Sequence, residues 1–161
     1  MSGRLSSGTV LKSASGISIK IDKFLAEGGQ GEVYVADYNG KKMALKWYKK
    51  AALGKNPQAF YDNIKQNAWR GAPSKEFLWP IDITEWQDET FGYVMDLRPE
   101  GYYEISEYML THVRFKSYKT IIDAALHIVT AYRTLHNSGY AYQDLNDGNF
   151  FINPVNGDVL I

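Results

Sequence analysis

Three polar side chains, Asp144, Asp147 and Asn149, crowd a short loop between two apolar runs near the end of the chain. A carboxylate can act as a general acid or base, and carboxylate and amide oxygens are suitable ligands for hard divalent cations. The same residue types are also common in turns that carry no chemistry. The loop is therefore either a catalytic loop or a polar turn, and the rest of the sequence has to distinguish the two.

A glycine cluster nearer the N-terminus, Gly28, Gly29 and Gly31, lies between two stretches of alternating apolar residues. Glycine lets a backbone approach a ligand where a Cβ would clash, and its N–H groups can face phosphate oxygens. Lys46 follows within one hairpin, and strand alternation places Ala44 and Lys46 on one face, under the glycine loop. The alternative is a glycine-rich hairpin without a ligand and a solvated lysine.

The elements that would position these residues begin with three strands. Ile17, Ile19 and Ile21 alternate with polar residues, which is the period of a half-buried strand. A second strand is expected over Glu32–Tyr38 and a third over Lys41–Tyr48, joined by a turn that is typical of two-residue hairpins. This opening is predicted to be an antiparallel meander.

The rest of the chain is expected to be mainly helical. Helices are expected over residues 56–71, 104–110 and 117–137, and the apolar segments 77–83, 91–97, 150–153 and the chain end near Ile161 are expected to be extended. The longest helix shows apolar residues three and four positions apart, which predicts a buried stripe. The stripe comprises Ile121, Ala125, Ile128, Tyr132 and Leu135, widened by Ile122, Leu126 and Val129. The order of elements favours an α+β fold in two lobes.

Composition narrows the function classes. The chain has 161 residues with 18 basic and 18 acidic side chains, so its formal charge is zero. This balance does not favour nucleic acid or an anionic membrane as a partner. The absence of cysteine excludes disulfides and thiolate metal sites, and the sequence has no run long enough for a signal peptide core or a membrane span. A soluble cytoplasmic protein is expected.

Three stretches resemble signatures of the eukaryotic-like, Ser/Thr-type protein kinase family, in the family's order. They are the glycine loop, the strand Met43–Lys46, and the loop Tyr142–Asn149. The resemblance implies a divergent bacterial-type member with a protein kinase-like fold: an antiparallel β N-lobe with one helix, then the start of a helical C-lobe. It implies a flexible lead-in over residues 1–8, an N-lobe over 9–97, and a hinge and first part of the C-lobe over 98–161.

The resemblance also implies roles for individual residues. Gly28, Gly29 and Gly31 would form the phosphate loop, while Val33 and Ala44 would enclose the adenine of ATP. Lys46 would bind the α- and β-phosphates and contribute to catalysis. Met95 would occupy the gatekeeper position, followed by the hinge residues Asp96 and Leu97. Asp144 would orient or accept the proton of the substrate hydroxyl, and Asn149 would hold Mg²⁺.

Several positions depart from the family pattern. Ala26 replaces the first glycine, and Asn63 stands where the helix glutamate that pairs with Lys46 is expected. The pair Tyr142-Gln143 replaces His-Arg, and Asn146 replaces a lysine that many Ser/Thr kinases direct at the γ-phosphate. The family's metal-binding aspartate is expected just beyond Ile161. The chain is therefore expected to be the N-terminal part of a catalytic domain and inactive by itself.

Three functions remain open from the sequence. The first is an ATP- and Mg²⁺-dependent protein kinase that acts on Ser/Thr hydroxyls of a protein substrate, completed by the remainder of the domain C-terminal to Ile161. The second is a pseudokinase or nucleotide-binding scaffold, which the residues Asn63 and Gln143 favour. The third is a small-molecule phosphotransferase of the same fold. The physiological substrate and the oligomeric state stay open.

Overall fold

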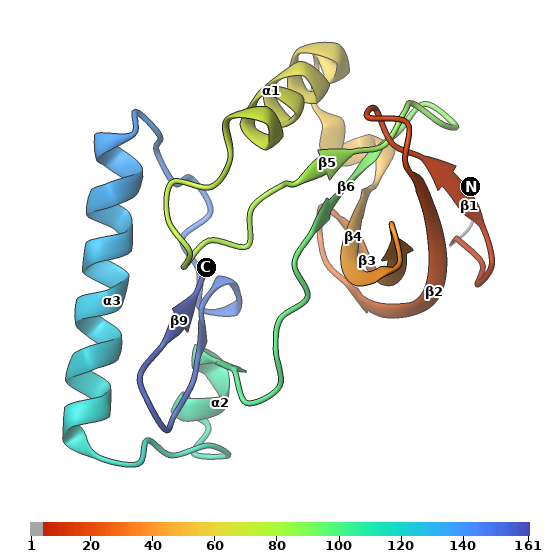
Figure 1. The fold of residues 1–161 in the computed structure, drawn as a ribbon. Coiled ribbons are helices and arrows are strands. Elements are labelled where there is room, and N and C mark those ends of the chain that lie inside the picture. The colour runs from red at the N-terminus through yellow and green to blue at the C-terminus, as the bar shows by residue number, and fades with distance from the viewer. Residues whose placement is uncertain (1–4) are drawn as a thin grey trace. The chain divides into compact units, whose positions relative to one another are not determined.

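The computed structural model describes residues 5–161, so the first half of the expected lead-in lies outside the described residues. Contacts divide the chain into two compact units (Figure 1). The first unit contains the chain up to Gly71 and then Trp79–Leu97; the second contains Ala72–Leu78 and Arg98–Ile161. Each unit is described by itself.

The first unit is built on an antiparallel six-stranded sheet with the order β1-β2-β3-β4-β6-β5. Its strands are β1 (Val10–Lys12), β2 (Ser18–Glu27), β3 (Gly31–Tyr38), β4 (Lys41–Tyr48), β5 (Asp82–Ile83) and β6 (Gly92–Met95). The expected meander is confirmed, and β4 has the expected bounds. The strand expected at Ile17–Asp22 continues to Glu27, with register shifts before Lys23 and before Ala26.

Strand alternation decides which side chains of this sheet form its core. Met43, Leu45 and Trp47 of β4 lie in one buried cluster with β2 and β3 residues such as Ile21 and Tyr34. The residues between them, including Ala44 and Lys46, therefore face the other side of the sheet. Ala44 and Lys46, two of the expected site residues, thus lie on the face opposite the main core.

A cluster of buried polar groups joins the β1–β2 turn to β5. Asp82 is 8% exposed, and its carboxylate accepts hydrogen bonds from Ser15 Oγ, from Tyr38 Oη at 2.8 Å and from its neighbour Ile83 N at 2.8 Å. Ser13 Oγ lies 2.9 Å from Ser15 Oγ. These contacts satisfy a carboxylate that would otherwise be costly to bury.

The helix α1 (Pro57–Arg70) follows the short 3₁₀ helix η1 (Lys50–Leu53) and lies within one residue of its expected bounds at each end. Asn56 Oδ1 accepts a hydrogen bond from Ala59 N at 3.1 Å and caps the helix, and Gly71 at its end has a positive φ of 79°. The helix packs its aromatic residues against β4 and β6 in a second buried cluster. That cluster comprises Tyr48, Leu53, Tyr61, Ile83, Phe91 and Tyr93, with Phe60, Ile64 and Met95 at its margin.

The second unit combines a three-stranded antiparallel sheet with helices. The sheet has the order β7 (Tyr103–Glu104), β8 (Phe151–Ile152) and β9 (Val159–Leu160). The helices are α2 (Ile105–Met109), α3 (Tyr118–Asn137) and the 3₁₀ helix η2 (Asp147–Asn149). The two expected helices are confirmed within one residue at each end, and Ser117 Oγ caps α3 by accepting from Thr120 N at 3.2 Å.

The expectation for residues 77–83 was wrong over most of their length, because only Asp82–Ile83 form a strand. The preceding backbone instead bonds to the chain end: Leu78 N donates to Ile161 O at 2.8 Å, and Ile161 N donates to Glu76 O at 2.7 Å. An apolar run of this length does not show whether its backbone will pair regularly.

Much of the expected apolar stripe of α3 is exposed in this chain. The buried residues of the helix are Thr120, Ala124, Ala131 and Leu135, so only Leu135 of the expected set is buried. The exposed members of the expected set are Ile121, Ala125, Ile122, Leu126 and Val129. Apolar residues occur on more than one side of this helix, and the small residues Ala124 and Ala131 allow closer packing than the bulky ones.

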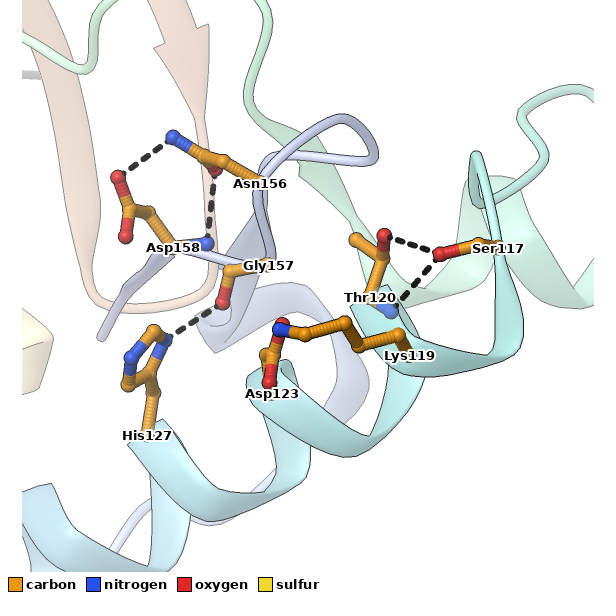
Figure 2. Close-up of polar contacts among 8 residues, drawn as sticks. All are labelled: Ser117, Lys119, Thr120, Asp123, His127, Asn156, Gly157 and Asp158. Carbon is orange, nitrogen blue, oxygen red and sulfur yellow. Dashed lines mark hydrogen bonds and ion pairs between the residues drawn. The ribbon is translucent and has the colours of Figure 1, made fainter.

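The turn between β8 and β9 packs against α3 (Figure 2). Gly157 lies so close to the helix that a Cβ would be 2.8 Å from Thr120 O and 3.1 Å from Ala124 N. His127 Nδ1 lies 2.8 Å from Gly157 O and donates to it, because a carbonyl oxygen can only accept. Asn156 Nδ2 donates to Asp158 Oδ2 at 2.7 Å and braces the turn itself.

Within residues 5–161, no helix is long and apolar enough to span a membrane.

Candidate functional site

The glycine loop connects β2 to β3 in the first unit. The space available for a side chain differs among its three glycines. A Cβ on Gly31 would lie 2.2 Å from Trp47 O, so the close approach of β4 requires glycine there. A Cβ on Gly28 would have only Gly31 O nearby, at 4.0 Å, and a Cβ on Gly29 would meet nothing within 4 Å. Packing therefore explains Gly31. The Gly28 N–H donates to Gly31 O at 2.8 Å, so Gly29 is the glycine that leaves an open backbone for a ligand to approach.

Lys46 lies in β4, and its ammonium contacts the tip of this loop. Lys46 Nζ donates a hydrogen bond to Gln30 Oε1 at 3.2 Å and lies 5.6 Å from the centre of the Tyr48 ring. The sequence pattern gave no sign that Gln30 would contact Lys46. The structure thus brings the expected lysine and the glycine loop together within one unit.

The residues expected to enclose an adenine lie on the same face as Lys46. Val33 of β3 is paired directly with Lys46, and Ala44 of β4 is paired directly with Met95 of β6. Directly paired residues in an antiparallel sheet project to the same face. Val33, Ala44 and Met95 therefore form an apolar surface beside the ammonium.

The expected hinge residues follow β6. Asp96 is exposed and accepts a hydrogen bond from Lys41 Nζ at 2.9 Å. Leu97 is the last residue of the first unit.

The loop of the second unit is organised around the Asp144 carboxylate. Asn149 Nδ2 donates to Asp144 O at 2.7 Å and to Asp144 Oδ2 at 3.0 Å, and Asn146 Nδ2 donates to Asp144 Oδ1 at 3.0 Å. Asn146 Oδ1 in turn accepts from Gly148 N at 3.0 Å and caps η2. The two expected site residues of this unit are therefore in direct contact.

A single aromatic ring of α3 supports both ends of this loop. The Tyr132 ring lies 5.5 Å from Tyr142, nearly perpendicular to it, and 6.1 Å from Phe150. Burial, then the charge of Asp144, raises the pKa of Tyr142, while its hydrogen bond with Asn149 lowers it. Burial, then Tyr142, raises the pKa of Tyr132 to about 12. The sequence indicated Tyr132 as a core residue, but nothing in its spacing showed that it supports the loop.

Of the comparisons with known proteins, only the one with solved structures finds matches. Models of known protein families do not match the sequence, and neither do the curated proteins. Among solved structures, the Mycobacterium tuberculosis PknI kinase domain matches with a TM-score of 0.72 and 18% identity, over 99% of this chain and 62% of that chain. The chain has the protein kinase fold.

Two further kinases match with this fold. Vaccinia related kinase 3 matches with a TM-score of 0.69 and 19% identity, over 99% of this chain and 51% of that one. Rad53 1–466 in complex with AMP-PNP matches with a TM-score of 0.70 and 19% identity, over 93% of this chain and 39% of that one. The chain thus spans less than two thirds of these kinase structures, and such low identity establishes the fold alone.

The helix α1 contains the position at which the sequence pattern predicts a partner for Lys46. Asn63, the residue expected at that position, is exposed and accepts a hydrogen bond from Asn67 Nδ2 at 3.1 Å. Its neighbour Asp62 accepts from Gln58 Nε2 at 3.0 Å. Both side chains are engaged within their own helix, whereas Gln30 of the glycine loop provides an acceptor for Lys46.

Proposed function

We propose that this chain is the N-terminal part of an ATP- and Mg²⁺-dependent protein kinase that transfers phosphate to Ser/Thr hydroxyls of a protein substrate. The observation that carries the proposal is the contact of Asp144 with Asn149 in the second unit of a kinase fold. The activity belongs to the whole protein, since the chain spans 62% of the PknI kinase domain.

The first unit supplies the features that nucleotide binding requires. The open backbone at Gly29 is suited to phosphate oxygens, and the Lys46 ammonium adds a positive charge to the same loop. Val33, Ala44 and Met95 offer an apolar surface of the kind that encloses a purine. When bound, ATP with its Mg²⁺ supplies the phosphoryl group, and the metal neutralises the phosphate charge.

The second unit supplies a base and an oxygen ligand. An ionised carboxylate has about four lone-pair sites, so the amide donors on Asp144 leave it able to accept the proton of a substrate hydroxyl. Because Asn149 Nδ2 donates to Asp144, the amide oxygen Oδ1 is the atom that remains to act as a ligand. Mg²⁺ prefers such oxygen ligands, so Asn149 would fit as one ligand of the metal.

The decisive experiment compares two substitutions in the whole protein, Asp144→Asn and Asp147→Asn. Asp144→Asn removes the proton acceptor, so we expect loss of phosphate transfer to protein, measured with radiolabelled ATP, and unchanged nucleotide affinity. Asp147→Asn changes a carboxylate of the same loop and should retain transfer. Transfer that survives Asp144→Asn contradicts the proposed role.

A nucleotide-binding scaffold without phosphate transfer is the second candidate. The engagement of Asn63 with Asn67 and of Lys46 with Gln30 favours it, because a kinase helix normally offers a carboxylate to this lysine. In that case ATP raises the melting temperature by binding the folded state, while no turnover is detected in the same sample.

A further inference from the structure

Lys49, which the sequence alone suggested to be a solvated strand end, holds the glycine loop next to the end of β4. Lys49 Nζ forms an ion pair with Glu27 Oε1 at 2.6 Å and donates a hydrogen bond to Gly28 O at 3.0 Å. Its backbone N donates to Gln30 O at 2.9 Å. Lys49 therefore contacts the residue before the loop and two residues within it.

Lys49 itself is held firmly by its neighbours. It caps the short helix η1, and its carbonyl accepts from Ala52 N at 2.8 Å. That helix is anchored by Leu53, which is 3% exposed in the second buried cluster. The side chains of Lys49 and Glu27 are about 40% exposed, so the pair is accessible to substitution without disturbing the core.

These contacts determine which way the loop presents its backbone. The described peptide bonds are all trans, and in a trans peptide the C=O and the following N–H point in opposite directions. The Gly28 carbonyl points to the Lys49 ammonium, so the Gly29 N–H points away from it. A Cβ on Gly29 would meet nothing within 4 Å, so the space beside this residue is open to a ligand.

We propose that Lys49 is a positioning residue for nucleotide binding, which acts by holding the glycine loop with the Gly29 N–H directed outward. This inference rests on the proposed function. The Lys49 ammonium is neutralised by Glu27, so it does not serve as a phosphate ligand. A loop held in its binding conformation before the ligand arrives has less conformational entropy to lose on binding.

Variants of the whole protein test this role through the affinity for AMP-PNP with Mg²⁺, measured by calorimetry. Lys49→Met keeps much of the side-chain length and removes the charge, and Glu27→Gln removes the other charge of the pair. We expect each to weaken binding by roughly 2- to 5-fold, the equivalent of one exposed ion pair. The double variant should lose little more than Lys49→Met alone, and Lys49→Arg should retain affinity.

Two reference variants distinguish positioning of the loop from a general effect of removing a nearby positive charge. Lys50→Met removes an adjacent lysine that pairs with Glu89 at 2.8 Å, and it should leave the affinity unchanged. Lys46→Met should abolish binding if the proposed function holds. An equal effect of Lys49→Met and Lys50→Met overturns the positioning role. Tighter binding by Glu27→Gln also overturns it, since release of Lys49 would then create a direct phosphate ligand.

A readout without nucleotide keeps this inference separate from the proposed function. Backbone ¹⁵N order parameters of Gly28, Gly29 and Gly31 should fall in Lys49→Met and remain unchanged in Lys50→Met. If the wild type binds no nucleotide, the proposed function fails, and with it the role of Lys49 in nucleotide binding. A fall in the order parameters would then still show that Lys49 holds the loop, and unchanged values would overturn that as well.

Discussion

At the scale of single residues, Asp82 illustrates how hydrogen bonds keep a carboxylate charged inside the fold. Burial of Asp82 raises its pKa, but hydrogen bonds from Ser15, Ser13, Tyr38 and the Ile83 N–H together outweigh burial, so the pKa lies below its ordinary value. A carboxylate with a depressed pKa stabilises the folded state above its unfolded pKa, and this contribution is lost as the pH falls through the folded pKa.

We predict that Asp82→Asn lowers the free energy of unfolding by about 1–2 kcal/mol at pH 7, because an amide accepts fewer of these hydrogen bonds. The difference from the wild type should shrink as the pH falls below about 4, the unfolded pKa, and through the lower pKa of the folded carboxyl. Urea unfolding at a series of pH values measures both effects. Asp22→Asn, at an exposed residue paired with Lys42, serves as control, and an identical acid response of the two variants would contradict the prediction.

The glycine loop allows a second prediction at this scale. Gly31→Ala should destabilise the first unit by about 1–3 kcal/mol, the usual cost of overpacking, because the new methyl would collide with Trp47 O. Gly29→Ala should leave stability nearly unchanged, since its surroundings are open. Thermal unfolding of both variants decides this, and equal losses would show that the β3–β4 approach does not determine the need for glycine.

At the scale of elements, local signals predicted the fold well where they were strong. The turn at Asn39-Gly40 and the cap at Asn56 gave β4 and α1 their bounds, because turn and cap chemistry is encoded within a few residues. The strand β7 and the pairing of residue 78 with Ile161 were not predictable, because they depend on distant parts of the chain. The buried side of α3 was missed for the same reason.

The attachment of the β8–β9 hairpin to α3 yields a prediction about an element. Gly157 has a φ of 74° and a Cβ there would meet the helix, whereas Gly139 has a φ of 81° and open surroundings. Gly139→Ala should therefore cost only the roughly 1 kcal/mol of a left-handed alanine, while Gly157→Ala should cost about 1–3 kcal/mol more. Unfolding curves of the two variants give the difference, which reports the close approach alone; no difference would refute it.

The sequence allowed candidate site residues to be named one by one, but it did not indicate their contacts. The motif positions of Lys46, Asp144 and Asn149 could be read from their order and spacing. The engagement of Lys46 with Gln30 and the support of the loop by Tyr132 depend on side-chain directions that spacing leaves undetermined. Whether the site residues act as expected stays a prediction.

At the scale of the whole molecule, the described chain exposes an apolar surface on α3. This α3 apolar face comprises Tyr118, Ile122, Leu126 and Val129, which are 87%, 59%, 59% and 66% exposed. Residues three and four positions apart lie side by side on a helix, so the four side chains are contiguous. Contiguous exposed apolar surface of this kind favours association.

We predict that the 161-residue chain self-associates through this face at raised concentration. Leu126→Lys should increase the monomer fraction in sedimentation velocity and change the free energy of unfolding by less than about 0.5 kcal/mol, as for other exposed positions. Ala59→Lys adds the same charge at an exposed position of α1, away from the α3 apolar face, and should not alter association. A wild-type chain that stays monomeric at all concentrations refutes this prediction.

The support of both loop ends by Tyr132 has a consequence for how the loop can change. The segment between Tyr142 and Phe150 has both ends against one ring and a largely exposed interior. We therefore expect its exposed residues to tolerate substitution. Substitutions within this segment at exposed residues without such contacts, such as Leu145, should leave its ends in place. Insertions or deletions would change the span between the ends and shift Asp144 relative to Asn149. Loop exchange between such domains should therefore succeed at constant length and fail when the length is altered.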